Sequence, residues 1–220
     1  MPAKNSIKEY VENSFYHIYN RGVEKRLIFQ DEQDCAVFLG YLKEYLLPKD
    51  ENSLRKSLAD STLSPKQKDK ILKLLRLNNF SSTITLIAYC LMPNHFHLLV
   101  KQSEADSIDK FMQSLCTRYT MYFNRKYKRV GSLFQSVYKA VIVVSDKQLL
   151  YLTKYIHQQA MNLFNRPSSL MEYLGERNTL WIKPAEVLSF FSKGNRLLSY
   201  EAFVKEYDDF EVVNKLTIDE

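Results

Sequence analysis

The chain has 220 residues, a formal net charge of +6 and 45% hydrophobic residues, which is ordinary for a globular protein with a real core. No apolar stretch approaches the roughly eighteen residues of a membrane span, and residues 1–13 lack the apolar run of a signal peptide, so we expect neither membrane insertion nor export. The three cysteines are an odd, widely spaced set, which argues against a disulfide framework or a zinc ribbon. We expect reduced thiols in a cytoplasmic protein.

The first third of the chain predicts a strand, a helix and an insertion. Residues 15–19 read as a strand that ends at Gly22, and Asp31 can cap a helix with an apolar stripe. Residues 48–80 carry eight Lys or Arg against four acidic residues, with Ser64-Pro65 as a break between two short helices. A solvated helical hairpin is favoured here over a nucleic-acid contact.

The middle of the chain predicts a hairpin, a helix, a strand and a second helix. The elements are, in order, a strand over 83–91, a turn over 92–94, a strand over 95–100, a helix from Asp106 or Ser107 to about 130, a strand over 136–144, and a helix capped by Ser145-Asp146 that runs to about 164. The sum is a ferredoxin-like β-α-β-β-α-β antiparallel sheet of the α+β class with a following helix. We expect one domain over 1–164 and a C-terminal helical appendage over 165–220.

Two of the four histidines, His95 and His97, lie one residue apart on the expected strand 95–100. Because side chains alternate along a strand, both imidazoles project from one face while the apolar residues beside them project from the other. Two imidazoles can share a divalent ion, but two protein ligands rarely hold one alone, so a third ligand must come from elsewhere. A pair of partly exposed histidines that bind nothing stays open as the alternative.

The last helix of the predicted domain offers a third ligand. Its spacing places Tyr155 and Gln159 one turn apart on the same side. A glutamine carbonyl can bind a hard metal ion, and a tyrosine hydroxyl beside that ion could attack a phosphate. Spacing alone does not single out Tyr155, because any of the 15 tyrosines can simply pack.

The other two histidines are excluded from the metal site. His17 shares its strand face with Phe15 and Tyr19, which favours a structural or DNA-contacting role. His157 is rotated about 200° from Tyr155 around the helix.

Residues 118–139 carry six basic residues and no acidic one, with aromatic residues interleaved. Cations contact phosphates and aromatic rings stack on unpaired bases, although at least half of these aromatics are expected in the core. The nucleic-acid-binding candidates are Arg21, Arg118, Arg125, Lys126, Lys128, Arg129 and Lys139.

Several stretches together resemble the single-tyrosine HUH transposases (IS200-like), and more closely their REP-associated tyrosine transposase branch. The matching stretches are Tyr16-His17-Ile18-Tyr19-Asn20-Arg21-Gly22, Leu91-Met92-Pro93-Asn94-His95-Phe96-His97, Gly131-Ser132-Leu133-Phe134-Gln135 and Tyr155-Ile156-His157-Gln158-Gln159-Ala160. The resemblance spans roughly residues 15–164. Two departures are Gln159, where the family commonly has Asn, and Ala160, where it commonly has Pro and where the helix can continue straight.

The resemblance implies a transesterification on single-stranded DNA next to a hairpin, either a repetitive extragenic palindrome or a transposon end. Tyr155 would be the nucleophile that forms a 5′-phosphotyrosine, and His95, His97 and Gln159 would hold Mg²⁺ or Mn²⁺. A monomer is favoured over a homodimer. Two alternatives remain: a catalytically silent protein that binds hairpin DNA or RNA, and a metal-dependent hydrolase in which Tyr155 only packs.

Overall fold

A four-stranded antiparallel sheet organises the protein, whose computed structural model describes residues 10–161 and 166–206. The strands are β1 (Ser14–Arg21), β2 (Ile84–Met92), β3 (His95–Gln102) and β4 (Lys139–Val143), in the order β2-β3-β1-β4. All neighbouring pairs are antiparallel, as a ferredoxin-like fold requires. The predicted fold class is therefore confirmed, although β4 is shorter than the expected 136–144.

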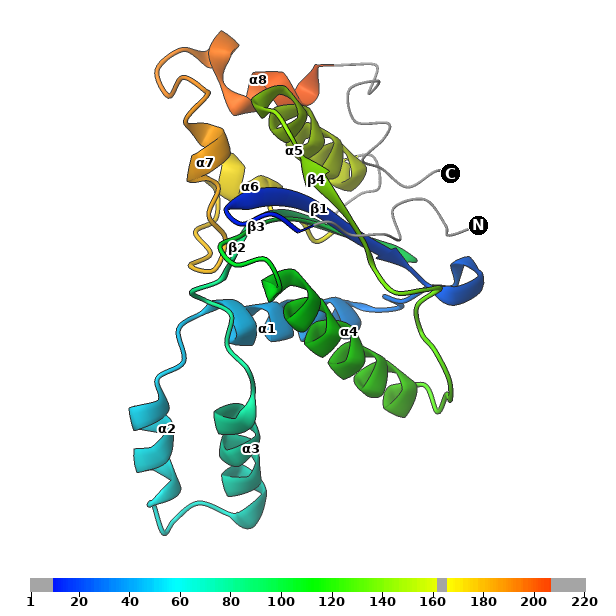
Figure 1. The fold of residues 1–220 in the computed structure, drawn as a ribbon, viewed down its shortest axis with the longest axis vertical. Coiled ribbons are helices and arrows are strands. Elements are labelled where there is room, and N and C mark those ends of the chain that lie inside the picture. The colour runs from blue at the N-terminus through cyan, green and yellow to red at the C-terminus, as the bar shows by residue number, and fades with distance from the viewer. Residues whose placement is uncertain (1–9, 162–165, 207–220) are drawn as a thin grey trace.

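Two long helices cover one face of the sheet (Figure 1). They are α1 (Glu32–Leu46) and α4 (Ser107–Lys126). The carboxylate of Asp31 accepts a hydrogen bond from the backbone N–H of Asp34, which is the predicted cap of α1. Every second residue of β1 and β3 points into the core between this face and the helices, including Ile18, Phe96 and Leu98.

The opposite face is covered by α5 (Asp146–Met161) and by the C-terminal segment, as Figure 1 shows above the sheet. The Ser145 hydroxyl accepts from the backbone N–H of Gln148 and so begins α5. The expected end of this helix, near residue 164, lies outside the described residues. The short helices of the C-terminal segment are α6 (Leu170–Tyr173), α7 (Ala185–Leu188) and α8 (Tyr200–Lys205), with a 3₁₀ turn, η2 (Arg196–Leu198).

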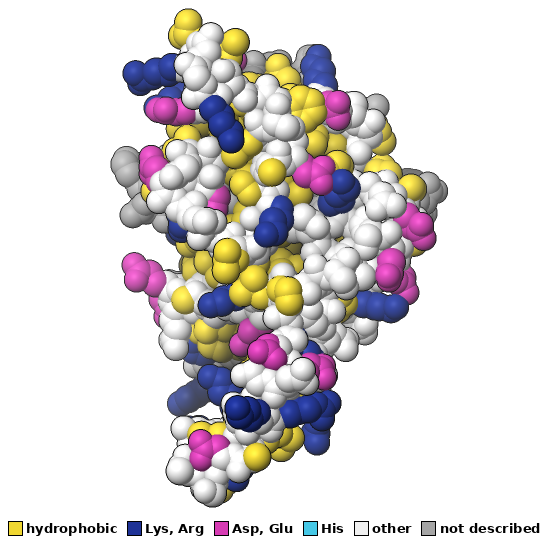
Figure 2. All heavy atoms as spheres, turned by 90° about the vertical axis from the view of Figure 1, so that its left-hand side faces the viewer, with side chains coloured by type: hydrophobic (Ala, Val, Ile, Leu, Met, Phe, Trp, Pro, Cys, Tyr) yellow, Lys and Arg dark blue, Asp and Glu magenta, His cyan; other side chains and the backbone are white. Residues whose placement is uncertain are grey.

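The insertion between α1 and β2 forms a helical hairpin that projects from the body of the molecule (Figure 1). Its helices are α2 (Glu51–Leu58) and α3 (Pro65–Arg76), and neither buries a residue. Ser64 caps α3 through a capping box with Gln67. Dark-blue side chains gather around this lower end of the molecule in Figure 2, in line with a solvated hairpin.

In the described part of the chain, no helix has the length and apolar character needed to cross a membrane. The three cysteines form no disulfide. A 3₁₀ turn, η1 (Val23–Lys25), follows β1 at the end of the sheet.

Candidate active site

Strand alternation places His95 and His97 on the face of the sheet that α5 covers. His97 pairs with Tyr19 across the β1–β3 ladder, and His95 pairs with Arg21. The residues between and after the histidines, such as Phe96, lie in the core on the other face. The two imidazoles therefore share one surface, as the sequence predicts.

The two imidazole rings stand perpendicular to each other, with centroids 4.9 Å apart. The Nδ1 atom of each ring is within hydrogen-bond distance of a neighbouring side chain. His95 Nδ1 lies 2.6 Å from the Oδ1 atom of Asn94, and His97 Nδ1 lies 2.9 Å from the Nε2 atom of His17. These contacts leave the Nε2 atoms as the ring nitrogens for a ligand.

Burial keeps both imidazoles neutral. Desolvation, with a contribution from the Arg21 charge, lowers the pKa of His95 to about 4. His97 is completely buried, and burial together with the charges of its neighbours holds its pKa well below the usual range. Neutral imidazole is the form that binds a metal ion, so the pair is ready for a ligand at pH 7.

Helix α5 brings Tyr155 against this pair. The Tyr155 ring makes an edge-to-face contact with the His97 ring, with centroids 5.6 Å apart. Gln159 follows one turn later on the same helix, and both side chains are partly buried. Tyr151, one turn earlier, instead contacts Phe203 of α8. The helix therefore presents Tyr155, and not Tyr151, to the imidazoles.

The chemistry of the side chains beside His97 suits a divalent cation. The Nε2 atom of His97 is buried and has no hydrogen-bond partner among the described residues, which costs about 1–3 kcal/mol unless a ligand satisfies it. No group of three or more His, Cys, Asp or Glu side chains in residues 10–161 and 166–206 is placed to hold a metal. A third protein ligand must therefore be of another type, and the amide of Gln159 is such a group.

The remaining histidines are both buried. His17 is fully buried and contacts His97, a position in keeping with the structural one of its two expected roles. Sequence alternation could place His17 on the correct face but could not supply its partner across the sheet. His157 bonds to the Tyr200 hydroxyl through Nδ1 and to the Ser169 hydroxyl through Nε2, so both of its nitrogens face the C-terminal segment.

The seven basic candidates do not form one surface. Arg118 pairs with Glu44 and lies over the Tyr41 ring, while Lys126 pairs with Asp31 and the buried Asp34. Arg118 and Lys126 therefore already form ion pairs within the protein. Arg125 is exposed on α4, on the face of the sheet opposite the histidines.

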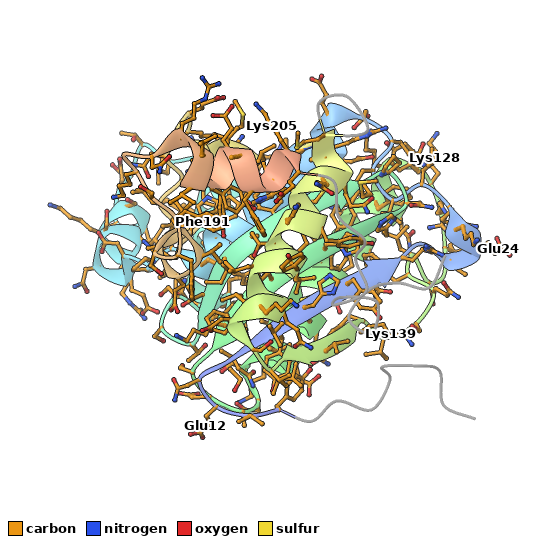
Figure 3. The ribbon with its side chains drawn as sticks, turned by 90° about the horizontal axis from the view of Figure 1, so that it is seen from above. Glu12, Glu24, Lys128, Lys139, Phe191 and Lys205 are labelled. Carbon is orange, nitrogen blue, oxygen red and sulfur yellow. The ribbon has the colours of Figure 1, made fainter. Side chains whose placement is uncertain are left out.

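Other basic residues gather at the end of the sheet where His95 lies. In the view of Figure 3, Lys128 and Lys139 are labelled on the same side as Glu24 of η1; Lys139 pairs with Tyr19 of β1, and Lys128 follows the end of α4. The loop before β4 joins η1 through the backbone bond from Val23 N–H to the Leu133 carbonyl. Burial and the neighbouring Arg26 charge lower the pKa of Arg129, as expected where cations lie close together. Lys25 and Arg26 are not among the candidates predicted from the sequence, because only the fold brings η1 beside this loop.

The aromatic residues between the cations are not available for stacking on bases. Tyr119, Phe123, Phe134 and Tyr138 are buried, and Tyr122 and Tyr127 pack against the same core. The hydroxyls of Tyr122 and Tyr127 donate to the Asp34 carboxylate. The interleaved pattern therefore reflects core packing by α4 and by the segment that follows it.

Comparison with known proteins gives a family for residues 55–159. No curated protein matches the chain. A solved REP-associated tyrosine transposase bound to a REP hairpin covers 80% of this chain and 95% of its own, with 8% identity and a TM-score of 0.45. A crystal structure of a candidate transposase from Deinococcus radiodurans R1 covers 72% and 98%, with 16% identity and a TM-score of 0.28. Neither likeness bears on the chemistry of this chain.

The informative comparison is with a family model. Residues 55–159 match the family described as IS200-like transposases. This stretch contains His95, His97, Tyr155 and Gln159. The match places residues 55–159 in the IS200-like transposase family.

Proposed function

We propose that the protein cleaves and rejoins single-stranded DNA beside a hairpin through a covalent bond to Tyr155, as a member of the REP-associated branch. The observation that carries the proposal is the contact of the Tyr155 ring with His97 within one chain. A nucleophile of this kind must lie beside the group that polarises its phosphate, and here no second subunit is needed to bring the two together. A monomer is therefore the active form that we propose.

The reaction is a balanced exchange of phosphate esters. The Tyr155 oxygen attacks the scissile phosphorus, the bond from phosphorus to the 3′ oxygen breaks, and the phenolic proton leaves to solvent while the 3′ oxygen gains one. The products are a 5′-phosphotyrosine and a 3′-hydroxyl. Attack by the 3′-hydroxyl of another strand reverses the step and joins DNA, so no external energy source is required.

The residues around Tyr155 have distinct roles. The two histidines and Gln159 would hold a divalent cation, which supplies positive charge to the phosphate oxygens when bound. Two imidazole nitrogens are softer ligands than the oxygens that Mg²⁺ prefers, which favours Mn²⁺. Arg21 lies across the ladder from His95 and would contact the same phosphate.

The test is covalent trapping on a labelled single-stranded hairpin oligonucleotide with Mg²⁺ or Mn²⁺. The wild-type protein should give a protein–DNA adduct on a denaturing gel. Tyr155→Phe should bind the DNA and give no detectable adduct, because the phenyl ring has no attacking oxygen. Tyr151→Phe is the matched control and should retain the adduct, since Tyr151 lies on the same helix as Tyr155 but contacts Phe203 of α8.

Other outcomes would support the alternatives. Adducts that persist in Tyr155→Phe would contradict the assignment of the nucleophile. Cleaved DNA without a covalent species would identify a hydrolase. Binding of the hairpin by the wild-type protein without any cleavage would identify a silent binding protein.

A further inference from the structure

We propose that Asn94 and His17 act as positioning residues that hold His95 and His97 with the proton on Nδ1, so that the Nε2 atoms of both rings face the metal ion. This inference rests on the proposed function, because it assigns an outer set of contacts to the same metal site. It adds two residues that touch neither the metal nor the DNA in the proposed reaction.

The Asn94 contact fixes the tautomer of His95. Asn94 Oδ1 lies 2.6 Å from His95 Nδ1, and an amide oxygen can only accept a hydrogen bond. The orientation of the amide is set by its nitrogen, which donates to the backbone carbonyl of Lys25 at 3.4 Å. His95 Nδ1 is therefore the donor, and a neutral ring then has its lone pair on Nε2.

The His17 contact does the same for His97 from the neighbouring strand. His17 is fully buried, and its Nε2 atom lies 2.9 Å from His97 Nδ1 with the two rings stacked at 5.0 Å. The Nε2 atom of His97 is the buried ring nitrogen that lacks a partner among the described residues. If His17 accepts the Nδ1 proton of His97, that unpartnered nitrogen carries a lone pair and can bind a cation.

The Asn94 and His17 contacts would act on the two imidazoles in the same way. Each metal-binding imidazole would donate its second N–H to a fixed acceptor, which orients the ring and raises its basicity as a ligand. Asn94 lies in the two-residue turn between β2 and β3, where its carbonyl accepts from Gly22 N–H, and His17 lies in the middle of β1, so the backbone of each acceptor is held by hydrogen bonds. The ligands are thereby preorganised before the metal arrives.

The first experiment measures the tautomers in the full-length protein without metal. Long-range ¹H–¹⁵N spectra of histidine-labelled protein separate rings protonated at Nδ1 from rings protonated at Nε2. His95 and His97 should both carry the proton on Nδ1. Asn94→Ala should shift His95 toward the other tautomer and leave His97 unchanged. A wild-type spectrum with the proton on Nε2 of either ring would overturn the inference.

The second experiment measures Mn²⁺ affinity by titration calorimetry. Asn94→Ala and His17→Leu remove the acceptors and should each weaken binding about 10–100-fold, the usual cost of losing such a contact. Asn94→Asp and His17→Gln keep an acceptor and should stay much closer to the wild-type affinity. Ile18→Val, next to His17 but on the opposite face of β1, controls for destabilisation of the strand.

The outcomes separate this inference from the proposed function. Equal Mn²⁺ affinity in Asn94→Ala, His17→Leu and the wild type would overturn the positioning roles. So would equal losses in His17→Gln and His17→Leu, because only the former retains an acceptor. A wild-type protein that shows the expected tautomers and affinities but forms no DNA adduct would refute the proposed reaction and leave the positioning roles standing.

Discussion

Arg21 is the residue whose position best links the histidine pair to a DNA substrate. It pairs with His95 across the β1–β3 ladder, and its charge helps to lower the pKa of both His95 and His97. The Nε atom of Arg21 is buried without a hydrogen-bond partner in the described ranges. An unsatisfied buried donor on a cation is well suited to a phosphate oxygen, which accepts and carries the opposite charge.

We therefore expect Arg21→Ala to slow adduct formation at saturating DNA by about 10²-fold, the usual loss for one group that stabilises developing charge. Arg21→Lys should give an intermediate rate, because it keeps the charge but loses the two-pronged geometry. Single-turnover trapping measures both. Arg55→Ala, an exposed change on α2, is the control. An Arg21→Ala protein with the wild-type rate would show that this cation does not contact the scissile phosphate.

At the scale of elements, the C-terminal segment holds the helix that carries Tyr155. His157 of α5 bonds to Tyr200 of α8, and Gln158 donates to the backbone carbonyl of Val204. The fully buried ammonium group of Lys154 lies over the Phe203 ring. The face of α5 that carries these residues is thus bound to α8, which leaves Tyr155 directed toward the sheet.

Removing one of these contacts should lower stability in a measurable way. Tyr200→Phe leaves the buried His157 Nδ1 without its partner, which should reduce the free energy of unfolding by about 1–3 kcal/mol. Urea denaturation measures the change. Tyr41→Phe, on the partly exposed surface of α1, should change the free energy by less than about 0.5 kcal/mol. Equal effects of the two substitutions would mean that the His157 contact does not contribute.

The elements differ in how far the sequence predicts them. Helices α1, α4 and α5 have long apolar periodicity and capping residues such as Asp31 and Ser145, and these local signals locate them well. The short helices α6, α7 and α8 have four to six residues each, too few for a periodic pattern. Their positions depend on tertiary contacts such as the bridge between Cys90 and Ser168, which no local pattern contains.

At the scale of the whole molecule, the same distinction applies to the candidate site. Alternation correctly placed His95 and His97 on one face, and helical spacing placed Tyr155 and Gln159 on one side, because both are local properties. The partners of these residues depend on strand register, which the sequence leaves open. The contact between His17 and His97 follows only once β1 lies beside β3. The roles of these residues stay predictions.

The distribution of charge over the molecule gives the last prediction. Lys25 is exposed on η1 beside the His95 end of the sheet, and Lys128 is exposed after α4 at the start of the loop that bonds to η1, whereas Lys66 and Lys70 are exposed on α3 in the projecting hairpin. If the DNA approaches the end of the sheet that carries His95, Lys25 and Lys128 contact its phosphates and the two lysines of α3 do not.

Lys25→Ala and Lys128→Ala should each weaken DNA binding and reduce the slope of log affinity against log salt concentration by about 0.7–0.9. Lys66→Ala and Lys70→Ala should leave the slope unchanged in the same fluorescence-anisotropy titrations. The opposite pattern would place the DNA on the hairpin, far from Tyr155, and would contradict the proposed orientation of the substrate.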